Sequence, residues 1–427
     1  MESSLKNRLL HPDQINIFLI ITLFLANLPA FSFWFFPWHR FTDNNNLPYV
    51  ITMIVINSLI WIITAVIILY LLKQHNVLGD FFQAWKKQWF LVAFIITAFI
   101  SIFWSISPLI SAYKVLILVV SSLLGSFIGY RFNLLRWLDL LFWFGVFLII
   151  LSIAFALMLP GLGTMPQYPY FGAWCGVFWN RNHLGSLVAL LNSVFLIKTL
   201  SDFQRDKPRV VLDLFFYLLS LIVVYKATSA AGYILTILLN FLIVLVALWL
   251  KFYLHIKKVH YLIIFGLFTV GMVWIASNLD FVFGLVNRTS SLTGRIPMWD
   301  FLFQNVIHQS PWLGYGYGAI WSIGSFRNGL SQAVGWLYPV TIGDNGFIDI
   351  LLSVGIVGLL SFLGVFVSGW IRAFKFVLAR RKIIDFFPLV FMLFTLMANI
   401  SFSLFLETES FIWLIMVAVL FIPDTNG

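Results

Sequence analysis

Charged residues are scarce in this sequence: they make up 10% of its 427 residues, whereas 61% of the residues are apolar. An ordinary soluble domain has about 25% charged and roughly 45–50% apolar residues. A soluble globular protein is therefore excluded. Cysteine occurs once, at Cys175, so the chain can form no internal disulfide. The sequence contains no Asp-x-Asp pair, His-x-x-x-His pair or cysteine cluster, so we expect neither a metal site nor a cofactor.

Long apolar runs take the place of charge. A run of about 20 apolar residues is long enough to cross a bilayer as a helix. We therefore expect an all-α polytopic membrane protein with about twelve transmembrane helices, at 15–36, 48–72, 89–107, 112–130, 134–159, 183–200, 210–225, 230–250, 261–280, 345–371, 386–404 and 410–422. The span at 112–130 contains Lys114 and the span at 210–225 is short, which makes these two the weakest predictions.

Basic residues indicate the orientation. If both termini are cytoplasmic, 19 of the 26 Lys and Arg residues fall on the cytoplasmic side of these spans. Such an excess follows the positive-inside rule and favours this topology. The same rule accounts for the formal charge of +10, so nucleic acid is not an expected partner. Seven basic residues remain outside and need another explanation: Arg40, Lys114, Arg181, Lys226, Arg288, Arg295 and Arg327.

Two long segments lie outside in this topology, and long connections in compact proteins are usually functional. One covers 160–182, and the other is a large periplasmic loop at 281–344. The expected organisation is thus residues 1–280 with helices one to nine, the loop 281–344, and residues 345–427 with helices ten to twelve.

Three arginines in these segments are candidates for binding an anion. Arg288 and Arg295 are seven residues apart, and on one helix they would share a face roughly 10 Å apart, a spacing that suits a diphosphate. The alternative is that both flank a loop near lipid headgroups. Arg181 precedes a predicted helix, where its charge opposes the helix dipole. An anionic ligand would compensate it; otherwise, it is an arginine that reaches the membrane surface.

Acidic residues supply candidates for a base. Asp344 stands at the start of the predicted tenth helix, where a helix N-cap is the first interpretation and a general base the second. Asp349 lies one turn deeper, and a carboxylate inside a membrane is expected to be functional or paired. Glu407 and Glu409 follow the eleventh span, where solvated charge is the simpler interpretation.

Two further patterns have simple structural interpretations. Gly314-Tyr-Gly-Tyr-Gly318 lacks the strand and helix context of a dinucleotide loop, so we interpret it as a flexible turn. Aromatic residues of the outer segments are expected to form an interfacial belt rather than sugar-binding platforms; they are Trp174, Trp179, Trp312, Tyr315, Tyr317, Trp321, Trp336 and Tyr338.

Four blocks, taken in order, resemble the O-antigen ligase and Wzy-type polysaccharide polymerase superfamily, including ExoQ-like exopolysaccharide polymerases. They are Gly176-Val-Phe-Trp-Asn-Arg181-Asn182-His183-Leu-Gly185; Ala227-Thr-Ser229-Ala-Ala-Gly-Tyr; Ser291-Leu-Thr-Gly294-Arg295-Ile-Pro-Met-Trp299 with Ser310-Pro-Trp-Leu-Gly314-Tyr-Gly316; and Asp344-Asn345-Gly346-Phe with Gly355-Ile-Val-Gly358. Each block alone is weak, and their combination is specific.

The resemblance implies a metal-independent, inverting glycosyltransferase with GT-C-type architecture. Such an enzyme takes a glycan from undecaprenyl diphosphate at the periplasmic face and transfers it to a sugar hydroxyl of an acceptor glycan or of lipid A core. By position, Arg181 and Arg295 would bind the diphosphate, with Arg288 as a neighbour, and Asp344 would be the base. Supporting residues would be Asn182, His183, Asn345, Asp349 and Glu407.

The sequence departs from the ligase pattern at Asp344, where a histidine is expected. We therefore favour the polymerase branch, for which a chain-length regulator is a candidate partner. O-antigen ligase is the first alternative. A transporter of small anions is the second, because twelve spans are typical of transporters too. A scaffold without chemistry would not explain the arginines outside.

Overall fold

The computed structural model describes residues 47–74, 76–166, 170–178, 180–203, 207–252, 295–336, 340, 342–380, 382–401, 403–407 and 411–423. Within these ranges the chain is helical, and one isolated bridge joins Thr164 to Trp174. The helices are α4 (Leu47–Gln74), α5 (Leu78–Lys86), α6 (Trp89–Ile100), η2 (Ser101–Trp104), α7 (Pro108–Arg131), α8 (Leu134–Met158), α9 (Pro160–Gly163), α10 (Arg181–Asp202), α11 (Lys207–Ala227), α12 (Ala230–Phe252), α15 (Arg295–Phe301), η3 (Leu302–Val306), η4 (Ile307–Gln309), η5 (Ile320–Ser322), α16 (Gly324–Ala333), α17 (Gly346–Arg380), η6 (Ile383–Phe386), α18 (Phe387–Ser401), α19 (Leu404–Glu407) and α20 (Phe411–Leu420).

Eight helical segments among the described residues are long and apolar enough to cross a membrane. They include α7 and α11, the two spans that the sequence predicted least securely. The span expected at 89–107 is the second arm of a helix pair that bends by 85° between α5 and α6. Spans predicted at 15–36 and 261–280 lie outside the described residues. The all-α, polytopic membrane class is thus confirmed.

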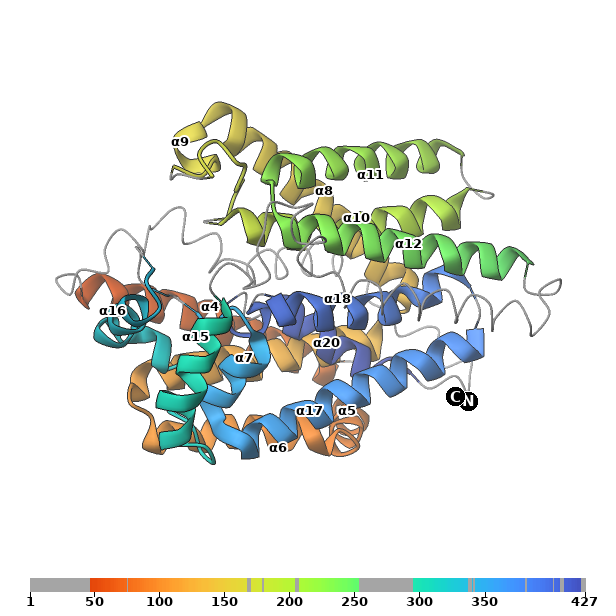
Figure 1. Ribbon diagram of the computed structural model, residues 1–427. Helices are drawn as coiled ribbons and strands as arrows, with labels where there is room; N and C mark the ends of the chain where they lie inside the picture. Colours follow the sequence, from red (N-terminus) through yellow and green to blue (C-terminus); the bar gives the residue numbers. More distant parts are fainter. Residues whose placement is uncertain are drawn as a thin grey trace, which may run out of the picture.

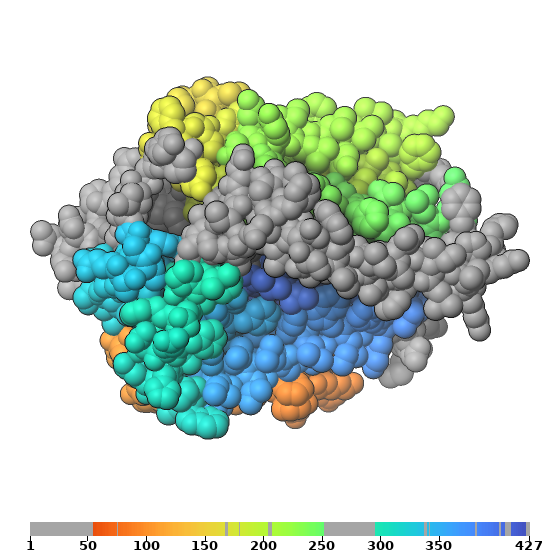
Figure 2. All heavy atoms as spheres, viewed as in Figure 1, coloured from red at the N-terminus to blue at the C-terminus, as the bar shows by residue number. Residues whose placement is uncertain are grey.

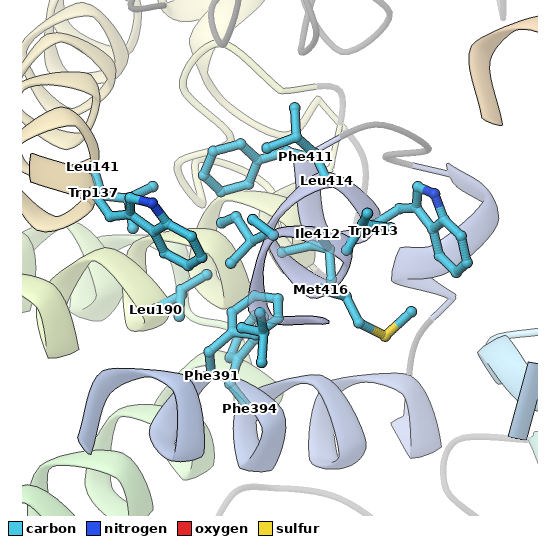
Figure 3. Close-up of a cluster of buried hydrophobic side chains, with 14 of the residues drawn as sticks. Trp137, Leu141, Leu190, Phe391, Phe394, Phe411, Ile412, Trp413, Leu414 and Met416 are labelled. Carbon is cyan, nitrogen blue, oxygen red and sulfur yellow. The ribbon is translucent and has the colours of Figure 1, made fainter. Parts of the chain in front are cut away.

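The helix described at the predicted last span is shorter than the predicted run. α20 has 10 residues, a length of about 15 Å, whereas a bilayer core is about 30 Å thick. All of its residues are buried. Figure 3 shows its side chains radiating between Trp137 and Leu141 of α8, Leu190 of α10 and Phe394 of α18. The run at 410–422 is apolar because α20 forms the interior of the bundle.

The long helices run between two ends of the molecule. α10, α12 and α17 all begin at the left end in Figure 1, where α9, α15 and α16 also lie. We call this the loop end. At the opposite end, basic residues occupy the last turns of α12 and α17, with Lys251 and Arg380 respectively. α18 lies between the two halves, because it contacts α10 and α12 on one side and α17 on the other.

A kink in α17 explains the glycine-rich segment before it. Gly355 has φ 65° and ψ −168° and interrupts the helix. Backbone N–H groups of Tyr315 and Gly316 donate to α17 carbonyls just before the kink, at 2.9 Å each, and the Pro311 carbonyl accepts from an amide just after it at 2.8 Å. Unsatisfied backbone groups are costly in a membrane, and this segment satisfies them. The prediction of a flexible turn at 314–318 is therefore wrong, because the turn is fixed by these bonds.

Residues of the predicted large loop form a compact cap at the loop end. α15, η3 and α16 pack around a small core of their own, which includes Met298, Leu302, Leu330 and Ile348 of α17. Figure 2 shows the segment from residue 295 onward as a surface continuous with α17. The described part of 281–344 is thus a folded helical unit that fixes residues against the start of α17.

Candidate functional site

An ion pair joins the candidate base, Asp344, to Arg295, a candidate diphosphate-binding residue. Arg295 is the first residue of α15, and its Nε donates to Oδ2 of Asp344 at 2.8 Å. The two side chains are 18% and 17% exposed. Both groups therefore remain partly accessible. The structure thus brings together two predicted site residues that are 49 positions apart.

Asp344 is not the N-cap of α17, contrary to the first interpretation of its sequence position. The cap is Asn345, whose Oδ1 accepts from the amides of Phe347 at 3.0 Å and Ile348 at 3.3 Å. Asp344 itself has φ 50°, a conformation that non-glycine residues rarely adopt. This backbone turn directs its carboxylate to Arg295 instead of to the helix. Strained residues of this kind concentrate at functional sites.

A second contact from α15 holds the same turn. The indole Nε1 of Trp299 donates to the carbonyl of Gly343 at 2.7 Å. Residues four apart on a helix share a face, so Arg295 and Trp299 reach adjacent residues of one loop. The Arg-x-x-x-Trp spacing in the sequence is explained by this double attachment.

Asp349 binds the turn at Gly343 and Asp344 from within α17. Its side chain is fully buried, and Oδ1 accepts from the amide of Gly343 at 3.1 Å and from Nε1 of Trp321 at 2.9 Å. Oδ2 accepts from the hydroxyl of Ser403. A side chain at Gly343 would place its Cβ 2.6 Å from Oδ1, so only glycine fits there. The predicted support role of Asp349 thus has a geometry: it fixes the residue before Asp344.

Ser403 lies in the break between α18 and α19, and Asn399 keeps that break in place. Oδ1 of Asn399 accepts from the amides of Leu404 at 3.0 Å and Phe405 at 3.2 Å. Glu407, a predicted support residue, ends α19, and its side chain is outside the described part. Glu409 and Arg288 also lie outside the described residues.

Arg181 belongs to a second cluster at the same end. It is the first residue of α10 and is 3% exposed. Its Nη1 donates to the backbone carbonyl and to the hydroxyl of Thr228, the latter at 3.1 Å. The guanidinium also lies 3.5 Å from the ring centroid of Tyr170. Thr228, like Asp344, is a non-glycine residue with positive φ, here 50°. The Thr228 oxygens and the Tyr170 ring therefore stabilise the positive charge of Arg181, which the sequence alone did not explain.

The first two sequence blocks, 176–185 and 227–233, contact each other next to Arg181. Asn182 Oδ1 accepts from the Ser229 hydroxyl at 3.0 Å. One turn along, a Cβ at Gly232 would lie 2.9 Å from Cα of Gly185, so α10 and α12 cross with their backbones nearly touching. This close approach requires glycine at both positions and explains the small residues in both blocks.

His183 faces apolar surroundings. It is 2% exposed and lines a small cavity with Phe178, Leu187, Phe394 and other apolar residues. Its ring meets Phe178 edge-on, with centroids 6.3 Å apart. His183 thus packs into the bundle below Arg181, a place suited to a structural residue.

Sequence reasoning missed several residues of these clusters. Trp321 was assigned to an interfacial belt, yet its indole binds Asp349. The spacing of Trp299 from Arg295 could have indicated that both residues reach the same loop. No sequence pattern indicated the contacts of Thr228, Tyr170 and Ser403, apart from their place in or near a motif. Among the described residues, no group of three or more His, Cys, Asp or Glu side chains could hold a metal ion.

A comparison with known protein families matches part of the chain. Residues 215–363 match a family model described as O-antigen ligase (Wzy_C). The match includes the Thr228 turn, Arg295 and its partner Asp344, and the kink at Gly355, whereas Arg181 precedes it. No curated protein matches the chain. Residues 215–363 are thus similar to the O-antigen ligase domain family, in agreement with the resemblance of the sequence blocks to the O-antigen ligase and Wzy-type polymerase superfamily.

Proposed function

We propose that the protein transfers a glycan from undecaprenyl diphosphate to a sugar hydroxyl at the periplasmic face of the bacterial inner membrane. The observation that carries the proposal is the Arg295–Asp344 pair: a guanidinium and a carboxylate 2.8 Å apart, both partly accessible, held on two sides by Trp299 and Asp349. These are the two charges that displacement of a diphosphate by a hydroxyl requires.

The proposed reaction is a single displacement. The acceptor hydroxyl oxygen attacks the anomeric carbon, and its proton passes to the Asp344 carboxylate. The bond between the anomeric carbon and the diphosphate oxygen breaks, and undecaprenyl diphosphate leaves with the electron pair. Arg295 is placed to stabilise that growing negative charge with its planar, charge-assisted donors. Attack opposite the leaving group inverts the anomeric centre, and the arginine takes the role that a metal ion has in other transferases.

Arg181 is proposed to act on the same diphosphate. It lies at the loop end with Arg295, and it is preorganised by Thr228 and by the Tyr170 ring. Preorganised donors cost little reorganisation when charge develops. Gathering of the arginines at one end of the bundle disfavours the transporter alternative, because transporters bind their substrates near the midplane.

Orientation in the membrane follows from the two ends. Basic last turns of α12 and α17 support a cytoplasmic position for the end opposite the loop end, with both chain termini cytoplasmic.

A cysteine at the exposed Ser325 of α16 tests this orientation in spheroplasts. Burial raises the pKa of the Cys175 thiol to about 12, so the native cysteine contributes little background. Reaction of Ser325→Cys with an impermeant thiol reagent supports a periplasmic loop end; labelling only after permeabilisation inverts the topology.

The product separates polymerase from ligase. Purified protein would receive one undecaprenyl-diphosphate-linked repeat unit, with or without lipid A core, and products would be resolved by size. We expect a ladder of lengthened lipid-linked chains without lipid A core. A single transfer that requires lipid A core would identify the ligase instead. No transfer to either acceptor by wild-type protein would refute the proposed function.

A further inference from the structure

Arg327 has a buried nitrogen atom that no described residue satisfies. It lies in α16 at the loop end, and its side chain is half-buried. Its Nε is buried, and no described residue accepts a hydrogen bond from it. No carboxylate among the described residues forms an ion pair with Arg327. A buried donor without an acceptor costs about 1–3 kcal/mol, and more when it is charged.

The other described cations of the loop end have either protein partners or exposure to water. Arg295 has the carboxylate of Asp344, and Arg181 has the Thr228 oxygens and the Tyr170 ring. Lys226 is exposed and can be hydrated. Among the described arginines at this end, Arg327 alone combines partial burial with a buried Nε that lacks an acceptor in the part of the chain that the structure describes.

The surroundings of Arg327 increase the cost of its charge. It lies in the first turn of α16, which has no side-chain N-cap, and there the helix dipole is itself positive. Burial lowers the pKa of the Arg327 guanidinium, and no acidic group raises it. An anion would relieve both effects. Leu330 of the same helix is 1% exposed and packs into the core of the cap, which fixes α16.

Contacts connect Arg327 to the Asp344 turn. Its neighbour Phe326 packs on Trp321, with ring centroids 5.6 Å apart. The Trp321 indole binds Asp349, which also binds the amide of Gly343. Arg327 is thus carried on the same packed unit that positions the Arg295–Asp344 pair.

We propose that Arg327 is a further substrate-binding residue that takes an oxyanion, a phosphate or carboxylate group, at the loop end. The ligand class follows from the guanidinium, which pairs best with planar or tetrahedral oxyanions. Only the source of that anion rests on the proposed function: it is either the diphosphate of the lipid-linked donor or an acidic group of the acceptor glycan.

Inorganic pyrophosphate is the probe for the site itself. Purified full-length protein would be titrated with pyrophosphate at constant ionic strength, and Arg327→Gln would be compared with Lys226→Gln, which removes an exposed charge from the same end. We expect about 10- to 100-fold weaker binding for Arg327→Gln, the loss of one charge-assisted contact, and almost no change for Lys226→Gln. Equal effects of the two variants, or no effect, would overturn the proposal.

Thermal unfolding without pyrophosphate gives a second, independent readout. Since the Nε of Arg327 has no acceptor among the described residues, Arg327→Gln is expected to unfold at the same temperature as wild type or at a higher one. A clearly lower unfolding temperature would make Arg327 a structural residue and refute the proposal. Arg327→Met, which keeps the apolar stem, is the second variant and should behave in the same way.

Transfer kinetics then assign the source of the anion. A higher KM for the lipid-linked donor, with the KM for the acceptor unchanged, identifies the donor diphosphate; the reverse identifies an acidic group of the acceptor. Failure of wild-type protein to transfer any glycan would refute the proposed function but leave the pyrophosphate and unfolding results standing.

Discussion

Replacing Asp349 by asparagine separates a positioning role from a catalytic one. The carboxylate accepts three hydrogen bonds, from Gly343, Trp321 and Ser403. Asparagine has the same shape, so its Oδ1 can keep the first two bonds. Its Nδ2 can donate to the Ser403 hydroxyl, which is able to rotate and accept.

The expected cost of this change is small. Hydrogen bonds to a charged group contribute roughly 0.5–1.5 kcal/mol more than neutral ones, but burying an amide costs less than burying a carboxylate. These opposing terms leave a loss of about 1 kcal/mol in the free energy of unfolding. Asp349→Ala removes both acceptor oxygens and leaves three donors unsatisfied, and at about 1–3 kcal/mol for each unsatisfied buried group it should lose at least 3 kcal/mol.

The assay measures thermal unfolding and glycan transfer on the same preparations. If Asp349 holds the turn, Asp349→Asn should keep transfer within about tenfold of wild type, whereas Asp349→Ala should unfold at a clearly lower temperature. Loss of transfer by Asp349→Asn, with its unfolding temperature unchanged, would refute this reasoning. The base would then be Asp349 rather than Asp344.

Three further variants test the remaining contacts. Asn345→Ala removes the N-cap of α17 and should lower stability by about 0.5–2 kcal/mol in thermal unfolding; an unchanged unfolding temperature would contradict the assigned cap. Trp299→Phe loses the bond to the Gly343 carbonyl and should reduce transfer at a stability cost of about 1 kcal/mol, and normal kinetics would show that α15 needs only Arg295. Gly355→Ala forces a side chain into the positive-φ kink against the backbone of Trp312 and should lower expression and stability strongly; tolerance of alanine would show that the kink is not required.

Apolar length predicted the helices well because membrane helices are selected by a simple physical requirement. Runs of suitable length became helices even where Lys114 or a short span weakened the prediction. At 410–422 the described helix, α20, is shorter than the predicted span, and hydropathy cannot distinguish a residue that faces lipid from one that faces the bundle interior. α20 is buried on all sides.

Side-chain partners could be predicted only in part. The sequence placed Arg295 and Asp344 in the site, but it gave the cap to Asp344 instead of Asn345. Both residues suit a cap, and only the positive φ of Asp344 decides between them. Trp321 and Ser403 reach Asp349 from distant segments, so local patterns could not reveal these contacts.

The central claim is that Asp344 accepts the proton of the attacking hydroxyl, and the rate of transfer by Asp344→Asn tests it most directly. Asparagine can still accept the bond from Arg295 Nε but cannot take a proton, so we expect stable protein and a loss of about 100- to 10,000-fold in rate. Asp344→His should recover part of the rate. Asp300→Asn makes the same chemical change at an exposed position of α15 and is the control. Near-normal transfer by stable Asp344→Asn would contradict the account.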